Sequence, residues 1–262
     1  MRYFFQDHWS WFVTACVVLI WANLPGELAK MVLLPLWLLA WLLICCGTLE
    51  TAKLRRHAWL GQYLRDESSW HRRFQGGVLM LVWHLLTSAM VSLVLLALLR
   101  GTHVFDGAIL MAGFLLFLLI TARMRRVVDN HIRVGYRSKV ARRLVIPLVA
   151  ILLTLVLTVT RLFYPQPYLI DMAWSEVLQQ YVTSRAGDSL LGSLERGALV
   201  FEIATLWVIQ NSIEQMGLGN SKVRVLVWLL YFLTQGALAW AFIRLLTGQA
   251  ALKQYLQTIR SE

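Results

Sequence analysis

The sequence predicts an all-α protein, a polytopic membrane bundle of six transmembrane helices with a small extracytoplasmic helical segment. Composition is the first observation behind this prediction: of 262 residues, 58% are apolar, 15% are charged, and the mean hydropathy is +0.61. Soluble domains are nearer half apolar and a quarter charged. The second observation is that the apolar residues form runs close to the roughly 20 residues that a spanning helix needs. The third is that basic residues gather between particular runs.

Six uncharged runs define the predicted spans. Only Glu27 and Lys30 are ionisable between the first two runs, which predicts a tight hairpin. The short segment 100–106 joins the third run to the fourth in a second hairpin. The shorter runs reach spanning length by borrowing flanking residues. The runs are 9–24, 31–48, 77–99, 107–122, 144–160 and 225–243.

A seventh span stays open at 197–213. Its apolar part, 197–209, is interrupted only by Glu202 and covers little more than a dozen residues. Such a length suits an interfacial or re-entrant helix better than a full span. The choice decides the side of the C-terminus, because six spans return it to the side of the N-terminus.

The distribution of Lys and Arg predicts the orientation. Short loops rich in these residues stay in the cytoplasm, and the connections after the second and fourth runs contain most of them. The first and third connections have one basic residue each, and 164–196 has four acidic residues against two basic ones. We therefore expect the N-terminus in the cytoplasm and the protein in a bacterial cytoplasmic (inner) membrane. The residues after the second run are Lys53, Arg55, Arg56, Arg65, Arg72 and Arg73.

The basic stretch 123–143 suggests a contact with lipid. If it is helical, several apolar residues fall on one face, and the helix could lie on the anionic headgroups of the cytoplasmic leaflet. The plainer interpretation is that topology alone places basic residues there. The net charge of +11 has the same explanation, and without a base-reading motif we expect no nucleic-acid partner. The candidate headgroup contacts are Arg123, Arg125, Arg126, Arg133, Arg137, Lys139, Arg142 and Arg143.

An internal similarity appears at a spacing of 70 residues. Residues 51–56 align with 121–126, and the same offset places Arg72 and Arg73 over Arg142 and Arg143. This favours two successive units, 1–76 and 77–146, each a hairpin with a basic cytoplasmic loop, followed by a third part, 147–262. Chance matches between arginines at helix ends are the alternative. Repeats of this kind occur in transporters and also in scaffolds, so the repeat does not decide the function.

Polar residues inside apolar segments are the candidates for a pathway, because an ionisable group in hydrocarbon is costly unless it is paired or functional. Glu202 could line a polar route with Gln210 and Asn211, or simply face water. His84, inside the third run, could carry a proton or only pack. Gln235, beside Gly236, predicts an interhelical hydrogen bond at a close helix contact.

Enzyme and metal motifs are missing from the sequence. It has no HExxH pair, nucleophile elbow, phosphate loop or glycine-rich dinucleotide turn. The three cysteines lie in the first two runs without metal-ligand spacing, and no second intramembrane histidine joins His84 for a haem. We therefore predict no catalytic residue, no cofactor and no metal.

The segment 164–223 is the one sizeable region outside the main runs. Residues 174–182 predict an amphipathic helix, and 187–196 a loop or a second short helix. Two function classes remain. The first is a non-catalytic subunit or scaffold of a larger envelope membrane complex, bound to other membrane subunits. The alternative is a small oligomeric channel or transporter with a pathway near Glu202.

Overall fold

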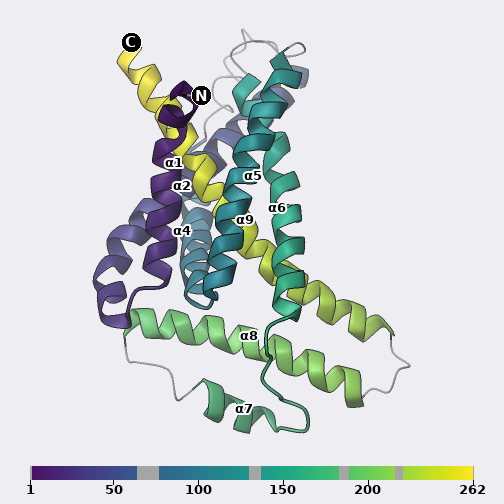
Figure 1. Cartoon of the computed structure of the whole chain (residues 1–262). Helices are drawn as coiled ribbons and strands as arrows, with labels where there is room; N and C mark the ends of the chain where they lie inside the picture. Colours follow the sequence, from purple (N-terminus) through teal and green to yellow (C-terminus); the bar gives the residue numbers. More distant parts are fainter. Residues whose placement is uncertain (1, 64–76, 130–136, 183–188, 216–220, 262) are drawn as a thin grey trace.

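The structure, a computed structural model, describes residues 2–63, 77–129, 137–182, 189–215 and 221–261. These ranges form eight α-helices and contain no strand (Figure 1), so the all-α prediction is confirmed. The helices are α1 (Arg2–Ala22), α2 (Gly26–Tyr63), α4 (Val78–Arg100), α5 (Val104–Asp129), α6 (Arg137–Leu162), α7 (Trp174–Tyr181), α8 (Leu190–Gln215) and α9 (Ser221–Ser261).

Five helices are long and apolar enough to cross a membrane, which confirms a multi-pass membrane protein by length and composition. They contain the stretches Gly26–Arg56, Val78–Arg100, Val104–Val128, Val140–Arg161 and Trp228–Lys253. The first predicted span lies in α1, where the described apolar stretch Trp9–Ala22 is shorter. The prediction of six spans therefore has five matching helices of full length and one shorter one.

The basic residues on either side of 130–136 continue the spanning helices. α5 extends to Asp129 and α6 begins at Arg137, so the described parts of 123–143 belong to two helix ends and not to one separate helix. Residues 130–136, with Arg133, lie outside the described residues. Where a spanning helix extends beyond its apolar run, the basic residues at its end lie in the headgroup region.

The open segment 197–213 lies within α8. Figure 1 shows α8 running transversely across one end of the bundle, with α7 beyond it and both chain termini at the other end. α8 is not one of the five candidate spans. The predicted loop or short helix at 187–196 is in part the start of α8, and the predicted amphipathic helix at 174–182 is confirmed by α7.

α9 is the central helix of the bundle, and it packs mainly against α2 and α6. Two glycines permit the contact with α2. A Cβ atom added to Gly47 would lie 3.1 Å from the Cα of Gly248, and one added to Gly248 would lie 1.7 Å from the carbonyl oxygen of Leu43. Small residues of this kind let the backbones of membrane helices approach closely.

A second, smaller core lies under α8. We call the described residues 163–182 and 189–215, which include α7 and α8, the cap. Its core contains Leu169, Val177, Ile203 and Leu206, all buried, and it is separate from the main core of the bundle. The cap is thus a packed layer with apolar contacts of its own.

Candidate functional site

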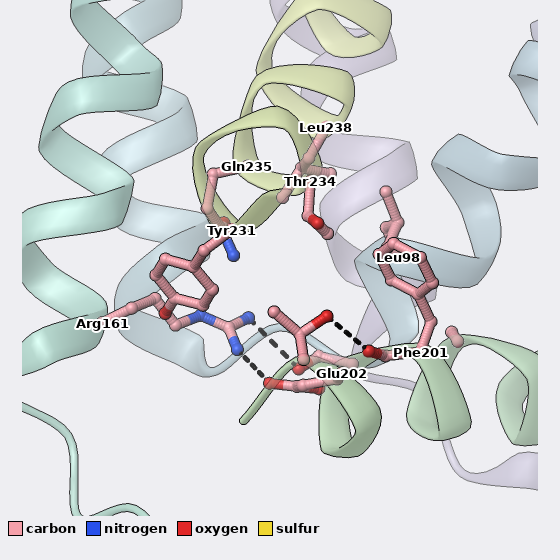
Figure 2. A pocket seen from close by; sticks show the side chains of 11 residues that line it. Leu98, Arg161, Phe201, Glu202, Tyr231, Thr234, Gln235 and Leu238 are labelled. Atoms are coloured by element: carbon pink, nitrogen blue, oxygen red, sulfur yellow. Dashed lines mark hydrogen bonds and ion pairs between the residues drawn. The ribbon is translucent and has the colours of Figure 1, made fainter. Parts of the chain in front are cut away.

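Arg161 lies at the centre of the charges that join the cap to the bundle. It is in the last turn of α6, and its side chain is 8% exposed. One guanidinium nitrogen lies 3.0 Å from the Oδ2 atom of Asp106 in α5. The other donates a hydrogen bond to Glu202 in α8, which Figure 2 shows as a dashed line. Arg161 therefore links three helices, two from the bundle and one from the cap.

Asp106 is held by the start of its own helix. It lies in the first turn of α5, and its Oδ2 accepts a hydrogen bond from the backbone N–H of His103 at 3.1 Å. A carboxylate is stabilised there by the helix dipole. The Tyr164 hydroxyl donates to Oδ1 at 3.2 Å. Burial and the Asp106 charge raise the pKa of the Tyr164 phenol, so it remains a donor at neutral pH.

A second ion pair joins α4 to the cap. The Nε atom of Arg100 lies 2.6 Å from the Oε1 atom of Glu195 in α8. The same guanidinium donates to the carbonyl oxygens of Ala22 and Leu24, at 3.0 and 2.7 Å, in the turn between α1 and α2. Arg100 and Arg161 together hold the N-terminal half of α8 at two points. We call these two ion-pair sets the latch.

A small cavity lies beside the latch. Arg161 and Glu202 line it together with Tyr231, Thr234 and Gln235 of α9, and its volume of about 30 Å³ has room for only about two water molecules. Gln235 is 6% exposed, and its Oε1 atom has no hydrogen-bond partner among the described residues. This oxygen therefore does not make the predicted interhelical hydrogen bond, which stays a prediction for the rest of the amide. Figure 2 shows the Gln235 amide directed toward the cavity that Arg161 and Glu202 line.

Gln210 and Asn211 have a different role from Glu202. Gln210 donates to the carbonyl oxygen of Pro167 at 2.8 Å and accepts from the backbone N–H of Leu169 at 2.7 Å. Asn211 donates to the carbonyl oxygen of Leu169 at 3.1 Å. These amides bond to backbone groups of the chain that leads into α7, as the backbone of a helix or strand would elsewhere. Neither residue lines the cavity beside Glu202.

His84 lies far from the latch. It precedes Arg100 by 16 residues on α4, which places it about 24 Å away along the helix. The charge of Arg244 in α9 interacts with it electrostatically. Of the five candidate pathway residues, Glu202 and Gln235 line the cavity beside the latch, Gln210 and Asn211 meet at the backbone of Leu169, and His84 lies apart from both pairs.

The candidate headgroup residues separate by exposure. Arg142 is directed inward, where its Nη2 atom lies 2.6 Å from the Oε1 atom of Glu50 in α2, and its side chain is 6% exposed. Arg125 and Arg137 are half-buried, and Arg123, Arg126 and Arg143 are exposed. The side chain of Lys139 is not among those that the structure describes. For the exposed residues the headgroup contact stays a prediction, whereas Arg142 connects α6 to α2.

Sequence reasoning missed the arginines of the latch. Arg100 and Arg161 each follow the end of a predicted run, where topology accounts for them without a partner. A signal did exist, because Asp106 immediately precedes the fourth run and places an acid at the same end of the bundle. Within the described part of the chain, no three His, Cys, Asp or Glu side chains could hold a metal ion. Comparisons with protein-family models, curated proteins and solved structures found no match.

Proposed function

We propose that this chain is a non-catalytic multi-pass subunit or scaffold of a larger membrane complex, and that the cap binds its partner. The observation that carries the proposal is the latch. Arg161 and Asp106 are buried, Arg100, Glu195 and Glu202 are half-buried, and their ion pairs fix a transverse helix to the end of the bundle. Charges that are paired in this way hold the cap in place against the bundle.

The energetics of the latch support a structural role. Removing charges from water is costly, and the cost is offset only where the geometry is good and further hydrogen bonds satisfy the groups. The two terminal nitrogens of Arg161 meet this condition with two carboxylates and a carbonyl oxygen, that of Gly101 at 3.4 Å, whereas its Nε has no hydrogen-bond partner among the described residues. The cavity beside it has the size of water molecules and leads to none of the other predicted pathway residues except Gln235.

The cap also has an exposed apolar surface. Tyr168 is 69% exposed and Phe163 is 82% exposed, and both lie on the chain between α6 and α7. Large exposed apolar groups ringed by polar ones are typical of an interaction site. We infer that the cap is extracytoplasmic, because the basic ends of the bundle helices lie at the opposite end with the termini. This proposal includes α1 as the sixth span and a bacterial inner membrane.

Photocrosslinking in the native membrane tests this role. We expect a photoreactive phenylalanine analogue at Tyr168 to form a crosslink to one partner protein in stoichiometric amounts. The same analogue at Leu119, an equally exposed residue on the flank of α5, should form none. Purification in mild detergent and mass spectrometry identify the product. Crosslinks only between copies of this chain, or none at either position, would contradict the proposal.

A channel or transporter is the second candidate, and the shared cavity of Glu202 and Gln235 is the observation in its favour. If the first proposal is correct, liposomes that contain the protein show no proton or monovalent-cation flux above protein-free liposomes, and Glu202→Gln changes nothing. Flux that is present in the wild type, lost in Glu202→Gln and kept in the exposed control Glu176→Gln would instead establish transport through this cavity.

A further inference from the structure

The arginines of the spanning helices differ in whether a carboxylate faces them. Arg100, Arg142 and Arg161 each form an ion pair with a carboxylate. Arg244 of α9 is also half-buried, but no carboxylate among the described residues pairs with it. A charged side chain in or near hydrocarbon is costly unless it is paired. The charge of Arg244 therefore needs a counter-charge from outside the described residues.

The guanidinium of Arg244 is held by α2 and by its own helix. Its Nη1 atom donates a hydrogen bond to the hydroxyl of Thr51 at 2.9 Å. That hydroxyl is oriented to accept, because its own proton is donated to the carbonyl oxygen of Gly47, also at 2.9 Å. The guanidinium carbon lies over the ring of Trp240, 5.1 Å from its centre. Nη2 donates to none of the described residues, so donors of a fixed guanidinium remain for a ligand.

The neighbours of this guanidinium add no negative charge. Arg55 of α2 interacts with Arg244 electrostatically, and it lies one helical turn after Thr51 on the same face. His84 of α4 also interacts with Arg244 electrostatically, and an imidazole is either neutral or positive. Glu50 precedes Thr51, but its carboxylate is paired with the guanidinium of Arg142. We call Arg244, Arg55 and Thr51 the basic site.

The basic site lies where the hydrocarbon ends. The predicted apolar runs of α2 and α9 end at residues 48 and 243. Arg244 follows its run at once, and Thr51 lies three residues past its own run, a rise of about 5 Å. The headgroup region on each side of the hydrocarbon is about 5–7 Å thick. A ligand that meets the guanidinium beside Thr51 is therefore at the level of the lipid phosphates, and Arg55 is exposed there.

We propose that the basic site binds a phosphate group, that of an anionic phospholipid headgroup. The fork of donors on a guanidinium matches the oxygens of a phosphate, and basic sites between membrane helices bind anionic headgroups in this way. An ammonium headgroup meets only cationic or neutral groups among the described residues of the site, so phosphatidylglycerol is preferred over phosphatidylethanolamine. Figure 1 shows the cap at the opposite end of the bundle from the chain termini, so this proposal and the partner surface at Tyr168 can fail independently.

Native mass spectrometry measures the binding. The protein is purified in a neutral detergent until it holds no lipid, and it is then titrated with phosphatidylglycerol, phosphatidylethanolamine or phosphatidylcholine of the same acyl chains. We expect one phosphatidylglycerol molecule to bind about tenfold more tightly than either of the others, the effect of one charge-assisted contact. Inorganic phosphate at the same concentration should not displace it. Displacement would assign the site to a soluble phosphate and overturn the lipid assignment.

Three variants localise the site. Arg244→Gln removes the central charge and should abolish the tenfold preference. Arg55→Gln should reduce it about threefold, as expected for an exposed charge. Arg126→Gln also removes an exposed arginine near the end of a helix, that of α5, and should change the affinity by less than about twofold.

Thermal unfolding without lipid shows whether each variant is folded. We expect Arg244→Gln to unfold at the wild-type temperature, because its loss leaves no described carboxylate unpaired. Equal losses of affinity in Arg244→Gln and Arg126→Gln would mean that diffuse surface charge attracts the lipid, and would overturn the proposal. Equal binding of all three lipids by the wild type would overturn it as well. Arg55→Gln and Arg126→Gln provide the same comparison even if Arg244→Gln fails to fold.

Discussion

Replacing Gly248 with Ala is expected to destabilise the protein by about 3 kcal/mol or more, at the upper end of overpacking effects. The added Cβ atom would lie 1.7 Å from the carbonyl oxygen of Leu43 and 2.4 Å from its carbonyl carbon. Both atoms belong to the backbone of α2, so no side-chain rotation can relieve the overlap. α2 and α9 must move apart, and the contact between these two helices is the most extensive in the bundle.

Thermal unfolding in detergent measures this effect, with Gly197→Ala as the matched control. Gly197 also lies inside a helix, but a Cβ atom there would meet no heavy atom within 4 Å. Alanine is the better helix former, so the control should gain about 0.5–1 kcal/mol. A Gly248→Ala protein as stable as the wild type would mean that the close approach of α2 and α9 does not exist.

Replacing Arg161 with Met is the second change with a large expected effect. It leaves Asp106, which is 0% exposed, and Glu202 without their cation. Breaking a buried ion pair from one side costs about 3–5 kcal/mol, because the remaining charge is buried without compensation. We expect the cap to lose its attachment, with a lower unfolding temperature and faster proteolysis within α8.

Two further variants distinguish the latch from a general loss of charge. Arg196 also lies on α8 but is exposed, so Arg196→Met should change stability by less than about 0.5 kcal/mol. Adding Asp106→Asn to Arg161→Met removes one uncompensated charge and should restore part of the loss. If Arg161→Met and Arg196→Met have equal effects, the latch does not hold the cap.

The main helices of the bundle could be predicted from the sequence, because crossing a membrane imposes a length and a composition on each one. Five predicted runs lie inside helices of spanning length, and the amphipathic pattern at 174–182 corresponds to α7. These features depend on residues that are close in sequence. The length of a hydrophobic run predicts a spanning helix, and the helical period of apolar residues predicts an amphipathic one.

The start of α8 was missed although a local signal was present. Ser189 caps the helix: its hydroxyl oxygen accepts a hydrogen bond from the backbone N–H of Gly192 at 3.1 Å. Serine is among the preferred residues at this position. Reading the apolar run alone places the helix at 197–209, seven residues after its true beginning at Leu190.

The latch and the glycine contact could not be predicted because they join distant segments. Arg161 and Glu202 are 41 residues apart, and neither position indicates which of the other charges it meets. Gln210 and Asn211 look like pathway residues in the sequence, yet their amides bind the backbone of the chain before α7. Such pairings depend on how helices pack, which hydrophobic patterns do not encode.

The side of the membrane on which the cap lies is the central claim, since the proposed partner surface at Tyr168 depends on it. With Cys16, Cys45 and Cys46 replaced by Ala, single cysteines are introduced as Glu176→Cys on α7 and Lys53→Cys in α2, toward the end that we propose is cytoplasmic, both exposed positions. Intact cells are treated with a membrane-impermeant maleimide. We expect labelling of Glu176→Cys in intact cells and of Lys53→Cys only after permeabilisation. Labelling of both positions from the same side would contradict this claim.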